Sequence, residues 1–247
     1  MKKIFYSCVL LCAVLLALVS CKKDYYVVSG VEAPRFGGSI MQYLEQNPLY
    51  FDTLVRVIKH AGMEAVLQNE SVTFFAPPDP CLDKIIRYVN EFQVESGKDS
   101  VTRFEQIKPE VWKKYLSMYI FPGNRGLRDF NQVDTLALDT YRGNLFETID
   151  DQVMNIGVIY NHAVNNNGTK EDLTDDVTLK YQGYRQLMLS YLYDYGGTGG
   201  VTWFNAPVAT SDIAPNNGRL HILKYRQHIF GFYGFRFAQS ANEAGIE

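Results

Sequence analysis

Apolar positions repeat at helical spacing in the first part of the chain. Ser39 is a suitable helix cap, and after Pro48 apolar residues follow three and four apart until Gly62, where a helix favours a left-handed residue. Helical spacing returns from about Asp79 and again over Lys108–Tyr115. These patterns predict a group of amphipathic helices before residue 116.

Strand patterns dominate the second part of the chain. Ser71–Phe75 and Leu116–Phe121 are the two early strands, and proline or glycine ends each of them. Later segments of strand character are separated by Gly, Asn and Asp turns. They are Thr135–Tyr141, Asn144–Ile149, Val153–Tyr160, Thr178–Tyr193, Val201–Ala209 and Arg219–Lys224. Helices early and strands late predict an α+β fold.

The body of the chain has no visible internal boundary. No linker or shift in composition divides residues 39–233, so we predict one domain there. We expect residues 234–247 to form a frayed C-terminal tail. With 247 residues, 47% of them hydrophobic, the chain can bury a sizeable core. A formal charge of −3 and the lack of a basic cluster exclude nucleic acid as an expected partner.

The N-terminus has the pattern of an export signal. Lys2 and Lys3 precede an apolar run, Val9–Val19, that is too short to cross a bilayer. The run leads into Leu18-Val19-Ser20-Cys21, which resembles a bacterial lipobox. The resemblance implies that residues 1–20 are a lipoprotein signal peptide and that Cys21 is acylated. The alternative is an ordinary secretory signal with an incidental cysteine.

Residues 21–38 are expected to be the lipidated cysteine and a tether. Acyl chains on Cys21 would hold the protein on a membrane without a spanning helix. No Asp directly follows Cys21, which by resemblance to a known sorting rule implies the bacterial outer membrane. Periplasmic and cell-surface orientations both stay open. After processing Cys81 is the remaining free thiol, so no intramolecular disulfide can form, and we interpret Cys81 as a small buried residue.

Four segments, in the same order, resemble a fasciclin-like domain. They are the helical stretch Phe51–Gly62, the segment Val72–Leu82, the segment Leu116–Gly123 and the segment Val208–Leu223. The family-motif residues are Phe75, Ala76, Pro77, Asp79, Tyr119, Pro122, Gly123, Asp212, Asn217, Gly218 and His221. The resemblance implies a non-catalytic adhesion or interaction module, shaped as a wedge with N-terminal helices packed on a mixed β-sandwich.

This chain departs from the family at two points. Tyr119 stands where the family has a central histidine, and the stretch between Gly123 and Val208 is longer than usual, which implies large insertions. A role for that histidine is therefore not carried over to this chain.

Structural roles explain most of the motif residues. Consecutive prolines at Pro77 end a strand, and Asp79 is placed to cap the following helix. Asn217-Gly218 would supply the positive φ angles of a tight hairpin turn. For His221 we favour a half-buried imidazole bonded to a backbone carbonyl over a functional role.

Signals for catalysis are weak. The sequence lacks a nucleophile elbow, a phosphate-binding glycine loop and zinc spacing, so we expect no enzyme, cofactor or metal. Asp150-Asp151 and Asp175-Asp176 would suit a glycan hydrolase only if two carboxyl groups faced each other. Asn165–Gly168 is similar to a calcium loop but fails its register, which leaves an irregular calcium site near Asp172 as a minor alternative.

Aromatic residues give the strongest candidate for a binding surface. Tyr191, Tyr193 and Tyr195 follow at strand spacing, and a glycine run separates them from Trp203. Sugars stack on such rings, although the same face could instead belong to the core. Partners left open are the membrane through the lipid, an extracellular matrix, a glycan and a surface protein. The rival function is an accessory glycan-binding lipoprotein of a TonB-linked uptake system.

Overall fold

Helices lie at both ends of the described chain and strands lie between them. The computed structural model describes residues 35–165, 177–196 and 200–247. The α-helices are α2 (Ile40–Glu45), α3 (Pro48–His60), α4 (Glu64–Asn69), α5 (Asp79–Glu95), α6 (Pro109–Ser117) and α7 (Gly234–Ala244). Short 3₁₀ turns are η1 (Phe104–Gln106), η2 (Leu127–Asp129) and η4 (Tyr225–Gln227).

Seven strands form one mixed sheet, in the order β2-β1-β9-β8-β7-β4-β3. They are β1 (Val72–Ala76), β2 (Ile120–Pro122), β3 (Asn144–Glu147), β4 (Val153–Tyr160), β7 (Arg185–Asp194), β8 (Val201–Ile213) and β9 (Gly218–Leu223). Only β1 and β9 pair in parallel within this sheet. Two further strands, β5 (Ala163–Asn165) and β6 (Val177–Leu179), pair separately. The α+β class is confirmed, while the wedge and the sandwich stay predictions.

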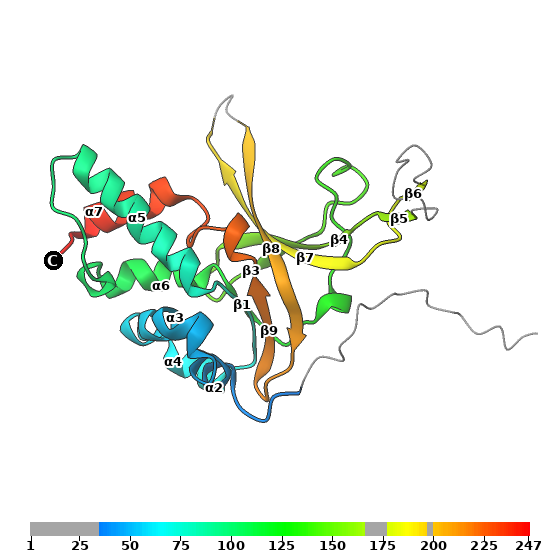
Figure 1. Ribbon diagram of the computed structural model, residues 1–247, viewed down its shortest axis with the longest axis horizontal. Coiled ribbons are helices and arrows are strands. Elements are labelled where there is room, and N and C mark those ends of the chain that lie inside the picture. The colour runs from blue at the N-terminus through cyan, green and yellow to red at the C-terminus, as the bar shows by residue number, and fades with distance from the viewer. Residues whose placement is uncertain (1–34, 166–176, 197–199) are drawn as a thin grey trace, which may run out of the picture.

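Strand β8 joins the two halves of the sheet. Its first half pairs with β7 as far as Pro207, and its second half pairs with β9 from Val208 onward. Register shifts near Thr210 interrupt the second pairing, and such irregularities bend a strand and increase its twist. Figure 1 shows β7 and β8 extending beyond the rest of the sheet as a two-stranded ribbon. We call this extension the β7–β8 ribbon.

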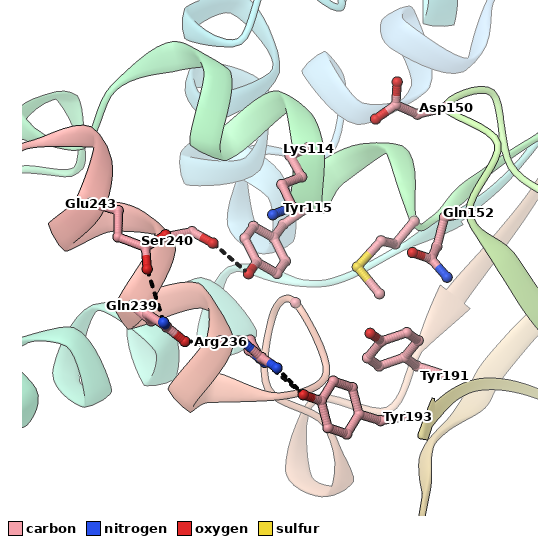
Figure 2. A pocket seen from close by; sticks show the side chains of 12 residues that line it. Lys114, Tyr115, Asp150, Gln152, Tyr191, Tyr193, Arg236, Gln239, Ser240 and Glu243 are labelled. Atoms are coloured by element: carbon pink, nitrogen blue, oxygen red, sulfur yellow. Dashed lines mark hydrogen bonds between the residues drawn. The ribbon is translucent and has the colours of Figure 1, made fainter. Parts of the chain in front are cut away.

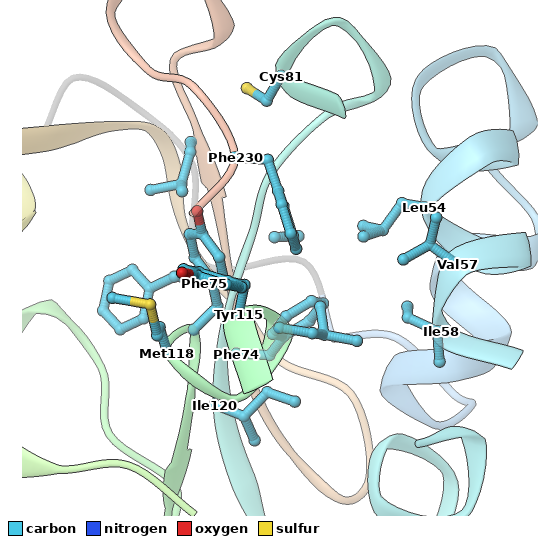
Figure 3. Packing of buried hydrophobic residues seen from close by; sticks show 14 of the residues in the cluster. Leu54, Val57, Ile58, Phe74, Phe75, Cys81, Tyr115, Met118, Ile120 and Phe230 are labelled. Carbon is cyan, nitrogen blue, oxygen red and sulfur yellow. The ribbon is translucent and has the colours of Figure 1, made fainter. Parts of the chain in front are cut away.

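Helices pack on the sheet around one continuous hydrophobic cluster. The buried face of α3 carries Leu54, Val57 and Ile58, and Figure 3 shows these side chains pointing toward Phe74 of β1. The cluster extends from Ile40 to Ala241 in the sequence. Residues from both ends of the described chain therefore share the same core.

The C-terminal segment is not a frayed tail. Residues 234–244 form α7, whose buried residues include Phe237, Ala238 and Ala241. The Phe237 ring lies 5.1 Å from Trp112 and 4.8 Å from Tyr115, both on α6. This prediction was wrong because position at the end of a chain was weighed above the helical spacing of these apolar residues.

Two predicted strands also differ from the structure. Residues 135–141 form turns instead of a strand. Asp134 closes this loop, because its N–H donates to Tyr141 O and its carboxylate accepts the Leu136 N–H. The predicted strand Thr178–Tyr193 is broken between Leu179 and Arg185, where Tyr181 has a φ of 60°. In addition, Leu116 and Ser117 belong to α6, and β2 begins only at Ile120.

The predicted export signal, Cys21 and most of the tether lie outside the described residues. Over the part of the chain that the structure covers, none of the helices has the length and apolar character to cross a membrane.

Candidate functional site

Several of the family-motif residues lie on or beside strand β1. Phe75 and Ala76 lie in β1 and are fully buried. The neighbouring Thr73 hydroxyl donates to Gly123 O at 2.7 Å and accepts the Arg125 N–H at 2.9 Å. The second motif segment therefore fixes the loop that follows the third.

His221 holds the same loop from the other side. Its Nε2 donates to Arg125 O at 3.1 Å, and its Nδ1 accepts the Asp212 N–H at 3.1 Å. Burial lowers the pKa of His221 to about 4, so the ring is neutral near pH 7. The ring bonds a backbone carbonyl as expected, but it is fully buried instead of half-buried.

Asp212 lies at an irregular point of β8. Its φ is 66°, which is rare for a residue with a side chain, and its carboxylate accepts the Leu127 N–H at 2.7 Å. Together with the His221 contacts, this bond ties β8 and β9 to the segment between Gly123 and Leu127. Asp212 therefore has a structural role in holding these segments together.

A turn joins β8 to β9 at this point, and the Gly218 N–H donates to Pro215 O at 3.4 Å, but neither Asn217 nor Gly218 has the expected positive φ. The Asn217 side chain instead accepts the Ile40 N–H at 2.8 Å and donates to Leu67 O at 3.0 Å. Gly218 lies against β1, where an added Cβ would be 1.9 Å from Val72 O. The predicted φ angles were wrong, because Asn217 and Gly218 are positioned by contacts with helices and with β1 that are far apart in sequence.

Asp79 does not cap its own helix. The cap position of α5 is Pro78, which makes no side-chain hydrogen bond, and Asp79 is the first helical residue. Its carboxylate accepts the N–H groups of Thr53 and Leu54, each at 3.0 Å. Burial raises its pKa while these two N–H groups lower it, and the net direction is upward. Asp79 thus links α5 to α3.

Tyr119 occupies the core beneath the C-terminal segment. Its hydroxyl donates to His228 Nε2 at 2.8 Å and accepts the Gly231 N–H at 2.7 Å. Burial lowers the pKa of His228 to about 3 and raises that of Tyr119, which keeps both groups neutral. The ring also stacks on Phe230 and Phe232. At the other end of the segment, Pro122 closes β2 and Gly123 turns the chain with a φ of 89°.

The predicted aromatic surface is present only in part. Tyr191, Tyr193 and Tyr195 lie along one face of the β7–β8 ribbon, with ring centroids 6.0 and 4.8 Å apart. Trp203 pairs with Leu192, and paired residues share a face, so Trp203 lies on the opposite side. Tyr195 is 50% exposed, and Tyr191 and Tyr193 are half-buried.

Sequence reasoning missed the residues that complete this surface. Tyr233 stacks on Phe204 at 4.9 Å and lies 5.2 Å from Tyr193. Arg236 donates from Nε to the Tyr193 hydroxyl at 2.8 Å. Arg236 belongs to the segment that was predicted as a tail, and Tyr233 is the last residue before it. The helical spacing of Phe237, Ala238 and Ala241 was the signal that could have placed this segment in the fold.

A groove lies where these aromatic rings face α6 and α7. Its volume is about 510 Å³, and Figure 2 shows Tyr191 and Tyr193 on one side with Arg236 and Gln239 on the other. We call it the tyrosine groove. Its lining residues are Lys114, Tyr115, Met118, Asp150, Gln152, Tyr191, Tyr193, Gly231, Arg236, Gln239, Ser240 and Glu243.

Polar groups in the tyrosine groove form short hydrogen-bond chains. On α7, Arg236 donates to Gln239 at 3.2 Å, and Gln239 donates to Glu243 at 2.8 Å. Across the helices, the hydroxyls of Tyr115 and Ser240 lie 3.0 Å apart. Burial raises the pKa of Tyr115, so this phenol is a neutral donor and acceptor. The groove thus combines aromatic faces with both kinds of hydrogen-bonding group.

The predicted catalytic and metal candidates have no shared centre here. Asp150 lines the tyrosine groove, whereas Asp175, Asp176 and the calcium candidate Asp172 lie outside the described residues. Within the described ranges, the structure has no group of three or more His, Cys, Asp or Glu suited to hold a metal ion. Burial raises the pKa of Cys81 to about 12, so its thiol is a poor nucleophile.

Comparison with known proteins adds little beyond these observations. No family model matches the sequence, and no curated protein matches it. Among solved structures, the chain is similar to a FAS1 domain pair from the insect cell adhesion molecule fasciclin I. The identity is 15%, the TM-score is 0.43, and the match covers 75% of this chain and 49% of that one. The chain spans about half the length of that domain pair.

Proposed function

We propose that this chain is a lipid-anchored, non-catalytic protein of the bacterial outer membrane whose fasciclin-like body binds a partner. One observation carries the proposal: the polar groups of His221, Asp212 and Asn217 are all used to join parts of the fold. The tyrosine groove, in contrast, is open to a ligand. The motif residues therefore support a scaffold, and recognition falls to surface groups beside it.

The tether meets the body at one end of β8, and the groove lies farther along the same strand. Arg35 pairs with Ala214, directly after β8, so the tether joins the body at that end of the strand. Phe204, which pairs with Tyr191, lies nine residues earlier in β8. At about 3.3 Å per residue, the groove is at most about 30 Å from the end of β8, beside which the tether meets the body.

The anchor is tested by metabolic labelling with an alkyne-bearing palmitate analogue in the producing bacterium. We expect label on the full chain, its loss in Cys21→Ser, and its retention in Cys8→Ser, which removes a cysteine of the leader. Protease treatment of intact cells then distinguishes the two faces of the outer membrane. Labelling that survives Cys21→Ser would contradict the proposed anchor.

Partner binding is tested by the adherence of cells that display the chain to surfaces coated with mucin, collagen or a neutral polysaccharide. We expect adherence to at least one surface, and its loss when Cys21→Ser releases the protein from the cell. Equal adherence of cells with and without the gene would contradict an interaction role.

A second candidate function is favoured by the composition of the tyrosine groove. Its aromatic and polar lining suits an accessory glycan-binding lipoprotein that serves a TonB-linked uptake system. Deletion of the gene would then slow growth on one polysaccharide while adherence stays unchanged.

A further inference from the structure

We infer that the tyrosine groove binds a neutral oligosaccharide. The inference rests on the proposed interaction function, because it names the chemical class of the partner. It depends on three features of the groove, namely its rings, its hydrogen-bonding groups and its balance of charge.

The rings form a continuous series that begins in the groove and leaves it. Tyr191 and Tyr193 line the groove, and Tyr195 follows 4.8 Å beyond Tyr193 with half of its surface exposed. Tyr233 lies 5.2 Å from Tyr193 and 6.3 Å from Tyr195, and it holds the two rings in place. Aromatic faces of this kind pack against the C–H face of a sugar ring, and a series of them fits several linked sugars.

Hydrogen-bonding groups face the rings across the groove. Gln239 and Glu243 lie one turn apart on α7 and offer donors and acceptors besides the bond between them. Arg236 is bonded to the Tyr193 hydroxyl and to Gln239, so it orients these two groups. In Figure 2 the hydroxyl of Tyr191 points toward the middle of the groove. The hydrogen bonds found within the described residues do not include this hydroxyl, so it is free to bond a ligand. Sugar hydroxyls both donate and accept, as this mixed lining requires.

Charges in the groove cancel. Lys114 and Arg236 are cations, and Asp150 and Glu243 are anions. An acidic ligand would gain from two of these groups and be opposed by the other two, and a basic ligand would meet the same balance. A volume of about 510 Å³ falls within the usual range of small-molecule sites. These features together favour an uncharged, hydroxyl-rich ligand over an anion or a basic peptide.

The test uses the full lipidated chain in a zwitterionic detergent without a sugar headgroup. The probes are maltotetraose, cellotetraose, mannotetraose and xylotetraose, with tetragalacturonate as an acidic comparison. Titration calorimetry gives the affinities, and saturation-transfer NMR shows which sugar protons contact the protein. We expect millimolar or tighter binding of at least one neutral probe and weaker binding of the acidic one.

Variants locate the site. We expect Tyr191→Ala to weaken binding about tenfold, because it removes one stacking face. Gln239→Ala should weaken binding less. Tyr191→Phe keeps the ring and removes the hydroxyl, so it measures the contribution of the hydroxyl alone. Tyr50→Ala is the matched control, since Tyr50 is 57% exposed on α3 and does not line the groove. Circular dichroism of each variant confirms that it is folded.

Three results would overturn the inference: no neutral probe binds at millimolar concentration, only the acidic probe binds, or binding is unchanged in folded Tyr191→Ala and Gln239→Ala. Retained adherence to mucin or collagen in the same preparation would leave the proposed function standing while the inference fails. Loss of acylation or of all adherence would instead contradict the proposed function.

Discussion

At the scale of single residues, the sheet depends on positions where two backbones approach closely. Gly218 of β9 faces Val72 of β1 in the parallel pair, and the Val72 N–H donates to Asn217 O at 3.2 Å. A side chain at Gly218 would meet the Val72 carbonyl at 1.9 Å. The requirement for glycine at this position is therefore one of space, because its φ is not positive.

Gly218→Ala should destabilise the protein by about 2 kcal/mol or more, because either β1 or β9 must move to admit the methyl group. Urea unfolding followed by circular dichroism measures the change. Gly37→Ala is the control, since no atom lies within 4 Å of an added Cβ there. A loss below about 0.5 kcal/mol for Gly218→Ala would show that the strands separate easily.

Two buried histidines make stability depend on pH. Burial lowers the pKa of His221 to about 4 and that of His228 to about 3, against about 6.5 in the unfolded chain. Below pH 6.5 both histidines become protonated in the unfolded state but stay neutral in the folded state. Stability is therefore complete above about pH 6.5 and falls toward pH 4, by up to about 1.4 kcal/mol per pH unit for each histidine.

NMR titration of the imidazole C–H signals checks this directly, with His221→Gln and His228→Gln used to assign them. We expect neither signal to titrate above pH 5, and we expect the urea midpoint to fall between pH 6.5 and pH 4.5. A midpoint between pH 6 and 7 for either ring would contradict the buried, neutral state.

At the scale of elements, α7 connects the core to the tyrosine groove. Its buried face carries Phe237 against Trp112 and Tyr115, and its other face carries Arg236 and Gln239 into the groove. The helix begins at Gly234, whose added Cβ would lie 3.0 Å from Tyr88 of α5. The geometry of the groove thus depends on how closely α7 packs against α5 and α6.

Phe237→Ala should cost about 3 to 5 kcal/mol, because it leaves a cavity beside three aromatic rings. Urea unfolding gives the loss. The matched control is Phe235→Ala, which removes the same side chain from a position that is 40% exposed, and its cost should be well below that of Phe237→Ala. Similar small effects for both variants would mean that α7 is loosely attached.

Short sequence patterns correctly predicted where some helices begin and where some strands end. Ser39 forms a capping box with Gln42, and β1 ends before Pro77 as expected. Patterns failed where distant parts of the chain decide the outcome. Asp79 bonds the N–H groups of Thr53 and Leu54 in α3 instead of those of its own helix, because tertiary packing brings α3 against the start of α5. The sequence pattern contains no trace of that approach.

The candidate site was predicted about halfway. Alternation along β7 placed Tyr191, Tyr193 and Tyr195 on one face, as the structure has them. The register between β7 and β8 was not accessible from the sequence, and it puts Trp203 on the other face. The contribution of α7 was missed because its position at the end of the chain was weighed above its apolar spacing, and the spacing alone does not show that a short helix is held in place by tertiary contacts.

At the scale of the whole molecule, the helices and the seven-stranded sheet of the described residues contribute to one hydrophobic cluster. Cys81 lies inside it at the start of α5, with no exposed surface, and Cys81 O accepts the Phe230 N–H at 3.2 Å. Cys81 thus lies in a cluster to which the N-terminal helices, the sheet and α7 all contribute. Exposure of Cys81 reports whether these parts separate together or one at a time.

Pulsed alkylation across a urea series tests this cooperativity, with the Cys81 peptide quantified by mass spectrometry so that other cysteines do not interfere. Because burial raises its pKa to about 12, the native thiol should resist alkylation at pH 8. We expect the labelling midpoint to coincide with the loss of circular dichroism, since a single core unfolds as one unit. Labelling at a clearly lower urea concentration would mean that α5 and its neighbours form a separately folding part, and the tyrosine groove would then lie at a boundary between two units.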